Sequence, residues 1–401
     1  MPLNYIDLFA GCGGLSLGLY NAGWHGLFAV EKNPDAFLTL STNLIEKKNH
    51  YFWPCWLSKS SLDIYDVIKT HSEDLKKLRG QVSLVVGGPP CHGFSMAGRR
   101  KQDDARNELF NAYLDFIRLV QPDTLLFENV HGFTVAFSDE IGNKGDAYSE
   151  IITEALKKEG YATHSKLIDM SEYGVPQKRK RFILIASRIF EPSRFFDLLD
   201  KNRKSFLASK KLTAPVTIVD AIGDLLMTNG TVDCPDSPNF KSGTYGKAVS
   251  AYQKYMRVGI RGSIPNSHRF AKHKDSTIEM FKMLMKASAK TQRYTPKTFD
   301  GLKKRSVTVV KAESVCPTVT SIPDDLIHFS EPRIPTVREV ARIQSFPDWY
   351  EFKGKYTTGG DRRKIDVPRY TQVANAVPPL FAEQVGLVLK ELLKDGGNIT
   401  F

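Results

Sequence analysis

Short apolar segments alternate with amphipathic ones through the first half of this 401-residue chain. The apolar segments are rich in Ile, Leu, Val and Phe, which is typical of short strands buried in a sheet. They are YIDLFAG, GLFAVEK, SLVVGGPP, TLLFENV and RFILIAS, beginning at residues 5, 26, 83, 124 and 181. Residues 106–120 and 148–160 instead carry apolar side chains at helical spacing. Because strand and helix alternate, the sequence predicts an α/β fold with a doubly wound, mostly parallel sheet.

The alternation fades in the middle of the chain, where Gly, Pro and Ser punctuate a basic sequence. Helical spacing returns at residues 336–346 and at 375–393, where an amphipathic helix follows a Pro-Pro pair. We therefore expect residues 1–190 to form the first part of a large domain and 191–312 to form a smaller, basic domain. Residues 313–401 are expected to return to the large domain and complete it.

The excess positive charge of the chain is concentrated in one segment. The formal net charge is +12, whereas residues 240–311 hold 17 Lys and Arg against three Asp and Glu, so this segment carries +14 and the rest of the chain −2. Aromatic residues are interleaved with these cations: Tyr245, Tyr252, Tyr255, Phe270 and Tyr294. The pattern predicts a surface for a polyanion, and the aromatic residues favour nucleic acid over an acidic membrane. The alternative is a solvated basic face that serves solubility.

The cysteines and the overall hydropathy exclude several classes of protein. The five cysteines are odd in number and widely scattered, so neither a disulfide framework nor a zinc cluster is indicated: Cys12, Cys55, Cys91, Cys234 and Cys316. No run of eighteen apolar residues is present, and the first residues do not form a signal peptide. We expect a cytoplasmic protein with no metal centre and no membrane association.

A glycine-rich loop follows the first predicted strand and opens a helix. Gly11, Gly13 and Gly14 allow a tight turn and a close approach to a ligand, as in sheets that bind dinucleotides or S-adenosylmethionine. Glu31 stands at the end of the second strand, where a carboxylate can accept both hydroxyls of a ribose. These glycines are not followed by a Lys with Ser or Thr, so a phosphate cradle is not indicated. A tight turn without any ligand is the alternative.

A cysteine in the stretch GGPPCHGFS stands where a parallel sheet binds its ligands. Cys91 follows the third predicted strand, and the carboxyl ends of such strands line a crevice. Pro89 and Pro90 stiffen the loop that holds it. A lone cysteine is usually a small buried hydrophobe. Here the glycines, the polar residues and the basic loop that follows favour an accessible thiol.

Seven short motifs, in order, resemble the cytosine-5 DNA methyltransferases, especially those of bacterial restriction-modification systems. They are FAGCGG, GGPPCHGFS, DDARNELF, ENV, QKRKR, PTVREVARIQSFP and QVANAVPP. The resemblance implies the S-adenosylmethionine-dependent methyltransferase fold, with catalytic residues in 1–190 and 313–401 and target recognition in 191–312. The sequence departs from the family pattern at His92, where Gln is usual, and at Ala374, where Gly is commoner.

The resemblance implies catalytic roles for Cys91, Glu128, Arg179 and Arg181. The Cys91 thiolate would add to carbon 6 of cytosine, so that carbon 5 can attack the methyl group of S-adenosylmethionine. Glu128 would hold ring nitrogen 3 and the exocyclic amine, Arg181 the carbonyl oxygen, and Arg179 the thiolate and nearby acid. The two arginines alternate, so both can point into one cleft. The alternatives are a loop contact for Glu128 and a solvated charge run for the arginines.

The resemblance also implies a set of residues around S-adenosylmethionine and its product S-adenosylhomocysteine. They are Phe9, Gly11, Gly13, Glu31, Asp63, Ile64, Pro89, Asn375 and Val377. Asp63 belongs to a short motif, SLDIYD, for which a surface aspartate is the alternative. Asn129 is expected to tie the nucleophile loop in place rather than to touch substrate.

Double-stranded DNA is the expected partner, and the target base must leave the stack to reach the thiol. The candidate DNA contacts are Ser95, Arg99, Arg100, Arg257, Arg261 and Arg269. We expect a monomer associated with the bacterial nucleoid, and a cognate restriction endonuclease acting on the same site is a further candidate partner. The sequence does not specify the recognition site or the base that removes the carbon-5 proton.

Three alternative functions follow from the same residues. A tRNA cytosine-5 methyltransferase would share the chemistry, but the long basic insert and CHGFS favour DNA. A catalytically inactive DNA-binding relative would lack Cys91, Glu128 or the arginines, all of which are present. A nicotinamide oxidoreductase is indicated by the glycine loop alone.

Overall fold

The computed structural model describes residues 3–89, 106–135, 137–138, 144–145, 147–302, 304–358 and 366–395. The chain divides into two compact units, each built from discontinuous segments. The first unit comprises Met1–Asp169, Lys180–Arg203 and Phe381–Phe401. The second comprises Met170–Arg179 and Lys204–Leu380.

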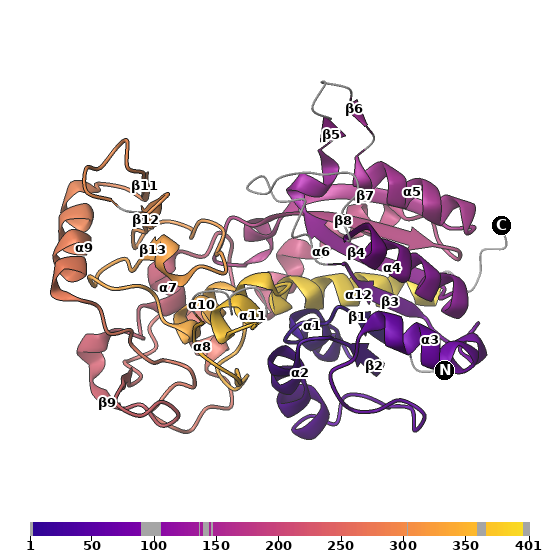
Figure 1. The fold of residues 1–401 in the computed structure, drawn as a ribbon, viewed down its shortest axis with the longest axis horizontal. Coiled ribbons are helices and arrows are strands. Elements are labelled where there is room, and N and C mark those ends of the chain that lie inside the picture. The colour runs from indigo at the N-terminus through magenta and orange to yellow at the C-terminus, as the bar shows by residue number, and fades with distance from the viewer. Residues whose placement is uncertain are drawn as a thin grey trace. The chain divides into compact units, whose positions relative to one another are not determined.

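The first unit is built on a six-stranded sheet with the order β2-β1-β3-β4-β8-β7 (Figure 1). Its strands are β1 (Asn4–Leu8), β2 (His25–Val30), β3 (Leu84–Gly87), β4 (Thr124–Val130), β7 (Ala162–Asp169) and β8 (Lys180–Ser187). Five of the six coincide with the predicted apolar segments or directly abut them; β7 was not predicted. The sheet is mostly parallel, as expected, but β8 runs antiparallel to both β4 and β7. Only residues 170–179 join β7 to β8, which is too short for the crossover that a parallel pair needs.

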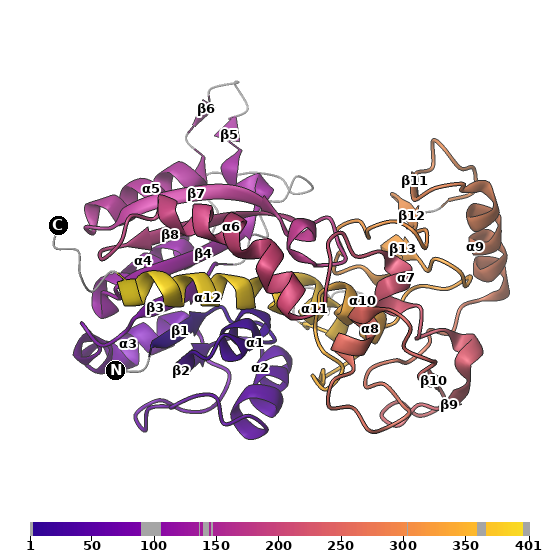
Figure 2. The same cartoon turned by 180° about the vertical axis from the view of Figure 1, so that it is seen from behind.

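Helices cover both faces of this sheet (Figures 1 and 2). They are α1 (Gly14–Asn21), α2 (Pro34–Leu40), the π-helix η1 (Ser41–Glu46), α3 (Ile64–Lys77), α4 (Arg106–Val120), α5 (Tyr148–Lys158), α6 (Ser193–Ser209) and α12 (Pro379–Asp395). Side chains of α3, α4 and α5 form one core with the strands, with Phe116 and Ile152 fully buried. The short elements η2 (His131–Thr134), β5 (Phe137–Ser138) and β6 (Lys144–Gly145) follow β4.

The C-terminal helix α12 docks on α1 at close range. A Cβ on Gly18 of α1 would lie 2.3 Å from the Cβ of Ala382, and one on Gly386 of α12 would lie 2.8 Å from the Cβ of Ala22. Trp24 Nε1 donates a hydrogen bond to the carbonyl of Gly386 at 2.8 Å. The residues from Phe381 onward accordingly belong to the first unit.

The second unit consists of short elements and long irregular connections. Its helices are η3 (Met170–Tyr173), α7 (Ile218–Ile222), η4 (Met227–Asn229), α8 (Ala251–Met256), α9 (Asp275–Ala287), η5 (Pro323–Asp325), α10 (Val337–Ile343) and α11 (Arg369–Asn375). Its strands are β9 (Thr231–Asp233), β10 (Lys241–Gly243), β11 (Gln292–Tyr294), β12 (Val307–Val309) and β13 (Leu326–Ile327). A local core that includes Phe281 and Leu284 of α9 stabilises the three-stranded sheet β11-β12-β13.

Residues 313–380 belong to the same unit as the basic segment. Two contacts of α10 contribute to this packing. The Tyr252 hydroxyl donates to the carbonyl of Arg342 at 2.7 Å, and the Arg342 guanidinium binds the Asp224 carboxylate. None of the helices in the described ranges has the length and apolarity needed to cross a bilayer.

Candidate active site

The predicted site residues of the first unit gather where the parallel strands end. Phe9 and Gly11 follow β1, Glu31 follows β2, Pro89 follows β3, and Glu128 lies near the end of β4. Because parallel neighbours point the same way, these positions share one edge of the sheet, where doubly wound folds bind ligands.

The glycine loop after β1 is tied to Glu31. Phe9 and Gly11 adopt left-handed backbone angles, with φ of 57° and 56°. The amide of Gly11 donates to Glu31 Oε2 at 2.8 Å, and the amide of Asn33 donates to Oε1 at 2.7 Å. Burial raises the pKa of Glu31, and the backbone donors oppose this shift. Both carboxylate oxygens are thus held in place while each keeps a lone pair for a ribose hydroxyl.

The same loop has room for a nucleoside ligand. Apart from its chain neighbours, no atom of the described residues lies within 4 Å of the position that a Cβ of Gly11 would take. Gly13, with φ of 86°, stands immediately before α1 and places the first amides of that helix beside the loop. An open glycine turn next to a fixed carboxylate fits the ribose and amino-acid parts of S-adenosylmethionine.

Asp63 lies at the start of α3, where the structure gives it local partners. Its Oδ1 accepts from the amide of Tyr65 at 3.0 Å, and its Oδ2 pairs with Lys32 Nζ at 2.7 Å. The next residue, Ile64, is buried. The carbonyl of Glu31 accepts from the amide of Leu62 at 2.8 Å, so this turn is anchored to the end of β2. Contacts of Asp63 and Ile64 with an adenine stay a prediction.

The two glycines of GGPPC let β3 end between two neighbouring backbones. A Cβ on Gly87 would lie 1.9 Å from the carbonyl oxygen of Leu8, and one on Gly88 would lie 2.0 Å from that of Glu128. The sequence pattern indicated only an accessible thiol after these glycines, and not this packing role. Asn129 Nδ2 donates to the carbonyl of Pro89 at 3.3 Å, a contact at the start of the loop that Asn129 is predicted to tie in place.

Some of the predicted residues lie outside the described residues: Cys91, Ser95, Arg99 and Arg100. Their roles therefore stay predictions from the sequence. The first described range, 3–89, stops at Pro89, two positions before the predicted nucleophile. This proline is buried, and its carbonyl contacts Asn129 near the end of β4.

Glu128 and Arg181 form an ion pair across strands β4 and β8. Arg181 Nε lies 3.1 Å from Glu128 Oε1, and the two side chains are 12% and 17% exposed. In the register of these strands Val130 faces Arg181 and Glu128 faces Ile183, so both charged side chains occupy one face of the sheet. The structure thus brings together two of the predicted catalytic groups in a partly exposed position.

Arg179, Asn375 and Val377 belong to the second unit. Arg179 is 2% exposed, and its Nη2 donates to the carbonyl of Ala376 at 3.2 Å. Asn375 is exposed at the end of α11, and Val377 is half-buried just beyond it. The arginine and the QVANAVPP motif therefore meet directly, as neighbours around Ala376.

Two of the three arginines predicted to read bases have intramolecular partners. Arg257 donates to the carbonyl of Gly246 at 2.8 Å and stacks 4.2 Å from the ring of Tyr245. Arg269 donates to Ser237 Oγ at 2.8 Å, and its guanidinium lies about 4 Å from two aromatic rings, those of Phe240 and Tyr356. Arg261 is exposed. The three residues are therefore not equivalent.

A family model described as C-5 cytosine-specific DNA methylase matches residues 3–391. The chain belongs to this family. It is an S-adenosylmethionine-dependent DNA (cytosine-5-)-methyltransferase, and the fold, the enzyme class and the cofactor predicted from the motifs are confirmed.

The curated relatives of the methyltransferase span nearly all of its length. Type II methyltransferase M.DdeI of Desulfomicrobium norvegicum is 30% identical over 95% of this chain and 87% of its own. M.XorII of Xanthomonas oryzae pv. oryzae is 30% identical over 97% of this chain and 85% of its own. A solved E. coli prophage-encoded protein, described as a DNA modification methyltransferase, shares 25% identity with a TM-score of 0.65 over 98% and 99% of the two chains. The S. pombe Dnmt2 methyltransferase, at 16% identity and a TM-score of 0.55, supports the fold alone.

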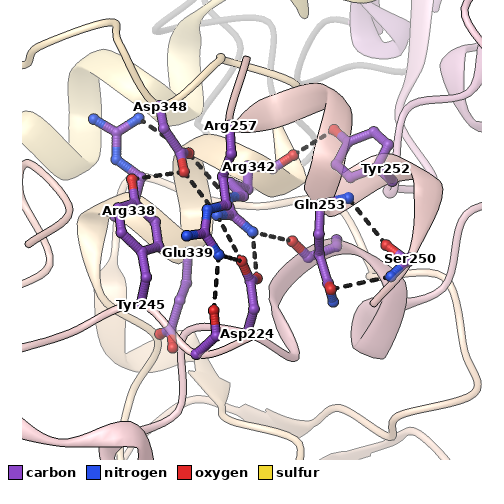
Figure 3. A network of polar contacts seen from close by, with 12 residues as sticks. Asp224, Tyr245, Ser250, Tyr252, Gln253, Arg257, Arg338, Glu339, Arg342 and Asp348 are labelled. Carbon is purple, nitrogen blue, oxygen red and sulfur yellow. Dashed lines mark hydrogen bonds and ion pairs between the residues drawn. The ribbon is translucent and has the colours of Figure 1, made fainter. Parts of the chain in front are cut away.

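Helix α10 of the methyltransferase carries a buried ionic network within the second unit (Figure 3). Arg342 is completely buried and binds two carboxylates, with Nη2 at 2.7 Å from Asp348 Oδ2 and 3.1 Å from Asp224 Oδ2. Burial would raise the pKa of Asp348, but the Arg342 guanidinium outweighs this effect and holds that pKa below its usual value. Arg257 and Tyr245 join the network from the basic segment through Asp224 and Asp348. The motif PTVREVARIQSFP therefore supports the basic segment.

A second buried polar cluster lies behind the glycine loop. The Ser16 hydroxyl hydrogen-bonds to the Asp7 carboxylate and lies 2.6 Å from the Tyr51 hydroxyl. Tyr5 extends the cluster through its contact with the Tyr51 hydroxyl at 3.4 Å. Burial raises the pKa of Asp7 to about 7, while the Ser16 hydroxyl opposes the shift and the Glu31 charge adds to it.

We expect the stability of the methyltransferase to fall between about pH 4 and pH 7 through Asp7. Its carboxyl binds a proton more tightly in the native than in the unfolded chain, so each rise in pH over this window favours unfolding, by a few kcal/mol in total. Asp7→Asn keeps a hydrogen-bond acceptor and removes this titration. Thermal melting of both proteins from pH 4 to 8 should show a decline in the wild type that the variant lacks. If the melting temperatures of the wild type and Asp7→Asn changed with pH in the same way, the role given to Asp7 would be wrong.

Proposed function

We propose that the methyltransferase modifies cytosine at carbon 5 within a specific duplex sequence, through a covalent bond between Cys91 and carbon 6. The Glu128–Arg181 pair at the edge of the sheet carries this proposal, because it sits where the loop holding Cys91 is anchored by Asn129. A flipped cytosine bound there presents its polar edge to a carboxyl and a guanidinium at once.

The chain supplies the nucleophile, the acid and the cation that the reaction needs. The Cys91 thiolate attacks carbon 6, and the electron pair of the double bond moves toward carbon 5 while Glu128 donates a proton to nitrogen 3. Arg181 stabilises the charge at the carbonyl oxygen. S-adenosylmethionine supplies the methyl group that carbon 5 takes up. Loss of the carbon-5 proton to a base then lets the carbon–sulfur bond break, which regenerates the thiolate and the aromatic ring, and nitrogen 3 returns its proton to Glu128.

Nine residues are proposed to hold the cofactor. Phe9, Gly11 and Gly13 provide the open turn, and Glu31 accepts the ribose hydroxyls. Asp63 and Ile64 are proposed to contact the adenine, Pro89 the methyl-bearing end, and Asn375 and Val377 the remaining side. In the second unit, Arg179 is proposed to support the thiolate and nearby acid and so to favour the ionised nucleophile.

Replacement of Glu128 by glutamine should lower kcat by about 10²- to 10⁴-fold, because the amide cannot donate an acidic proton to nitrogen 3. The affinity for S-adenosylmethionine should stay within about twofold, since Glu128 acts on the base. Single-turnover transfer and calorimetric binding of the cofactor measure the two quantities. As a matched control, Glu150→Gln changes an exposed glutamate at the start of α5 in the same unit and should leave both unchanged. Weakened cofactor binding with unchanged transfer in Glu128→Gln would contradict the role.

Bisulfite sequencing of DNA from cells that express the protein tests the proposed function most directly. We expect protected cytosines at one short sequence, and none in cells that express Cys91→Ser. Transfer to tRNA in the absence of any transfer to duplex DNA would overturn the proposal.

We further propose that residues 191–312 choose the DNA sequence while 1–190 and 313–401 carry the chemistry. The net charge of +14 on residues 240–311 supports this division, because phosphate neutralisation makes affinity fall steeply with salt. Grafting 191–312 onto a relative of known specificity should transfer the methylated sequence. An active chimera that keeps the recipient's specificity would contradict the division.

The relatives named Type II methyltransferases support a role in restriction-modification, in which this protein methylates the sequence that a partner endonuclease cleaves. We propose that the protein acts as a monomer in the bacterial cytoplasm, bound to the nucleoid. Protection of a plasmid from an endonuclease of the same specificity, after expression of this chain, tests the pairing.

A further inference from the structure

One loop of the basic segment is closed by hydrogen bonds and stands on the buried network. The loop, residues 257–264, follows α8 and is held at its base by the amide of Tyr245, which donates to the carbonyl of Ser263 at 2.9 Å. The side chain of Arg257 crosses the same gap to the carbonyl of Gly246 at 2.8 Å. Inside the loop, the amide of Ile260 donates to the carbonyl of Arg257 at 3.0 Å.

The base of this loop is held by two half-buried side chains, Arg257 and Tyr245, which bind a fully buried network. Arg257 pairs with Asp224 at 3.4 Å and stacks on Tyr245, whose hydroxyl donates to Asp348 at 2.7 Å (Figure 3). Asp224 and Asp348 are both bound by Arg342, and all three side chains are fully buried. Arg257 therefore serves as an anchor for the loop, and its planar fork is already engaged.

The tip of the loop faces solvent with an arginine between two apolar residues. Val258 and Ile264 are 66% and 40% exposed, and Arg261 is exposed between them. Arg261 makes no hydrogen bond or ion pair with any residue of the described ranges. Chain neighbours aside, no atom of the part of the chain that the structure describes lies within 4 Å of the Cβ positions of Gly259 and Gly262, on either side of Arg261. Exposed apolar side chains beside a free guanidinium indicate a contact surface rather than a solvated face.

The surrounding charge identifies the kind of partner. Residues 237–274 contain eight Lys or Arg and no Asp or Glu, so no carboxylate of this stretch competes for the Arg261 guanidinium. Duplex DNA offers both the phosphates that this charge attracts and base edges that match an arginine fork.

We propose that loop 257–264 reads the target DNA in the major groove, with Arg261 donating two hydrogen bonds to a guanine and Val258 packing on the neighbouring base. This inference rests on the proposed function and names its specificity residue. Because the loop backbone is already anchored, its conformational entropy falls little when DNA binds. The planar fork of the Arg261 guanidinium matches the O6 and N7 acceptors of guanine.

The test uses the full-length protein and a library of DNA duplexes. The sequence on both sides of one unmodified target cytosine is randomised, and methyl transfer to that cytosine is measured. Arg261→Ala should lower the preference for guanine at one position by about 10- to 100-fold, with preferences elsewhere unchanged. Arg261→Lys keeps the charge but lacks the planar fork, so it should lose most of that preference while the salt dependence of DNA binding stays as in wild type. Lys254→Ala, an exposed cation on neighbouring α8, is the matched control and should change no base preference.

Two results would overturn the proposal. One is a uniform loss of methylation at all sites in Arg261→Ala, which would make Arg261 a phosphate contact. The other is wild-type preference in either Arg261 variant. Melting temperatures of the variants should match the wild type, because Arg261 is exposed, and this excludes misfolding as a cause. Failure of the wild type to methylate carbon 5 of any cytosine would instead refute the proposed function itself.

Discussion

Cys91→Ser is expected to lower methyl transfer by at least about 10⁴-fold, because a serine alkoxide forms far less readily than a thiolate and adds to carbon 6 correspondingly slowly. The loop that holds Cys91 is anchored through Pro89 and Asn129, and the two glycines before it fit between β1 and β4. None of these contacts involves the sulfur. The variant should therefore fold, bind S-adenosylmethionine and bind DNA with affinities close to those of the wild type.

Cys55→Ser is the matched control, since Cys55 is an exposed thiol of the same unit and should be replaceable without loss of transfer. Duplex DNA with fluorine on carbon 5 of the target cytosine gives a second readout. Fluorine cannot leave as a proton does, so the wild type should remain bonded to the base after methyl transfer, whereas Cys91→Ser should form no adduct. Substantial turnover by the serine variant would exclude the covalent route.

Strands and motifs were predictable because their signals are local. Buried strands need continuous apolar runs, and the chemistry needs its thiol, carboxyl and guanidinium at the ends of those strands. The direction of β8 was not read from its sequence, since RFILIAS is equally apolar in either orientation and only the short connection to β7 decides it. Helix α6 (Ser193–Ser209) was missed, because its apolar residues are interrupted by the charged sequence DKNRK.

The roles of single arginines could not be predicted from composition. Arg257, Arg261 and Arg269 stand in the same basic segment, and each has the fork that guanine recognition needs. The partners that separate them are distant in sequence: Asp224 and Tyr245 for Arg257, and Phe240 and Tyr356 for Arg269. Only the fold brings these partners to the guanidinium, so only the fold shows that Arg257 and Arg269 are bound within the protein.

The same reasoning applies to the motif PTVREVARIQSFP, whose order in the chain indicates the family but not the contacts. Its Arg338 donates to the backbone of Asn266 and Tyr350, and its Arg342 binds Asp224 and Asp348. These partners all lie in the second unit. A motif of the methyltransferase family thus supports the segment proposed to recognise DNA, and variants of it should affect stability first.

Arg342→Met is accordingly expected to destabilise the protein by about 3–5 kcal/mol, because it leaves two buried carboxylates without their main counter-charge. Arg257 at 3.4 Å from Asp224 and Arg338 at 3.9 Å from Asp348 compensate only in part. The melting temperature should fall by roughly 10 °C. Calorimetry or urea unfolding measures the loss.

Arg118→Met provides the matched control, since Arg118 also binds two carboxylates, Asp115 and Glu159, at 2.9 and 2.8 Å, but is 49% exposed. Water screens this surface arrangement, so the control should lose no more than about 1 kcal/mol. Adding Asp224→Asn and Asp348→Asn to Arg342→Met removes the unpaired charges and should restore part of the lost stability. If Arg342→Met is no worse than Arg118→Met, or the added changes only destabilise further, charge pairing at α10 does not hold the recognition segment together, and shape packing around Tyr245 and Tyr252 must do so instead.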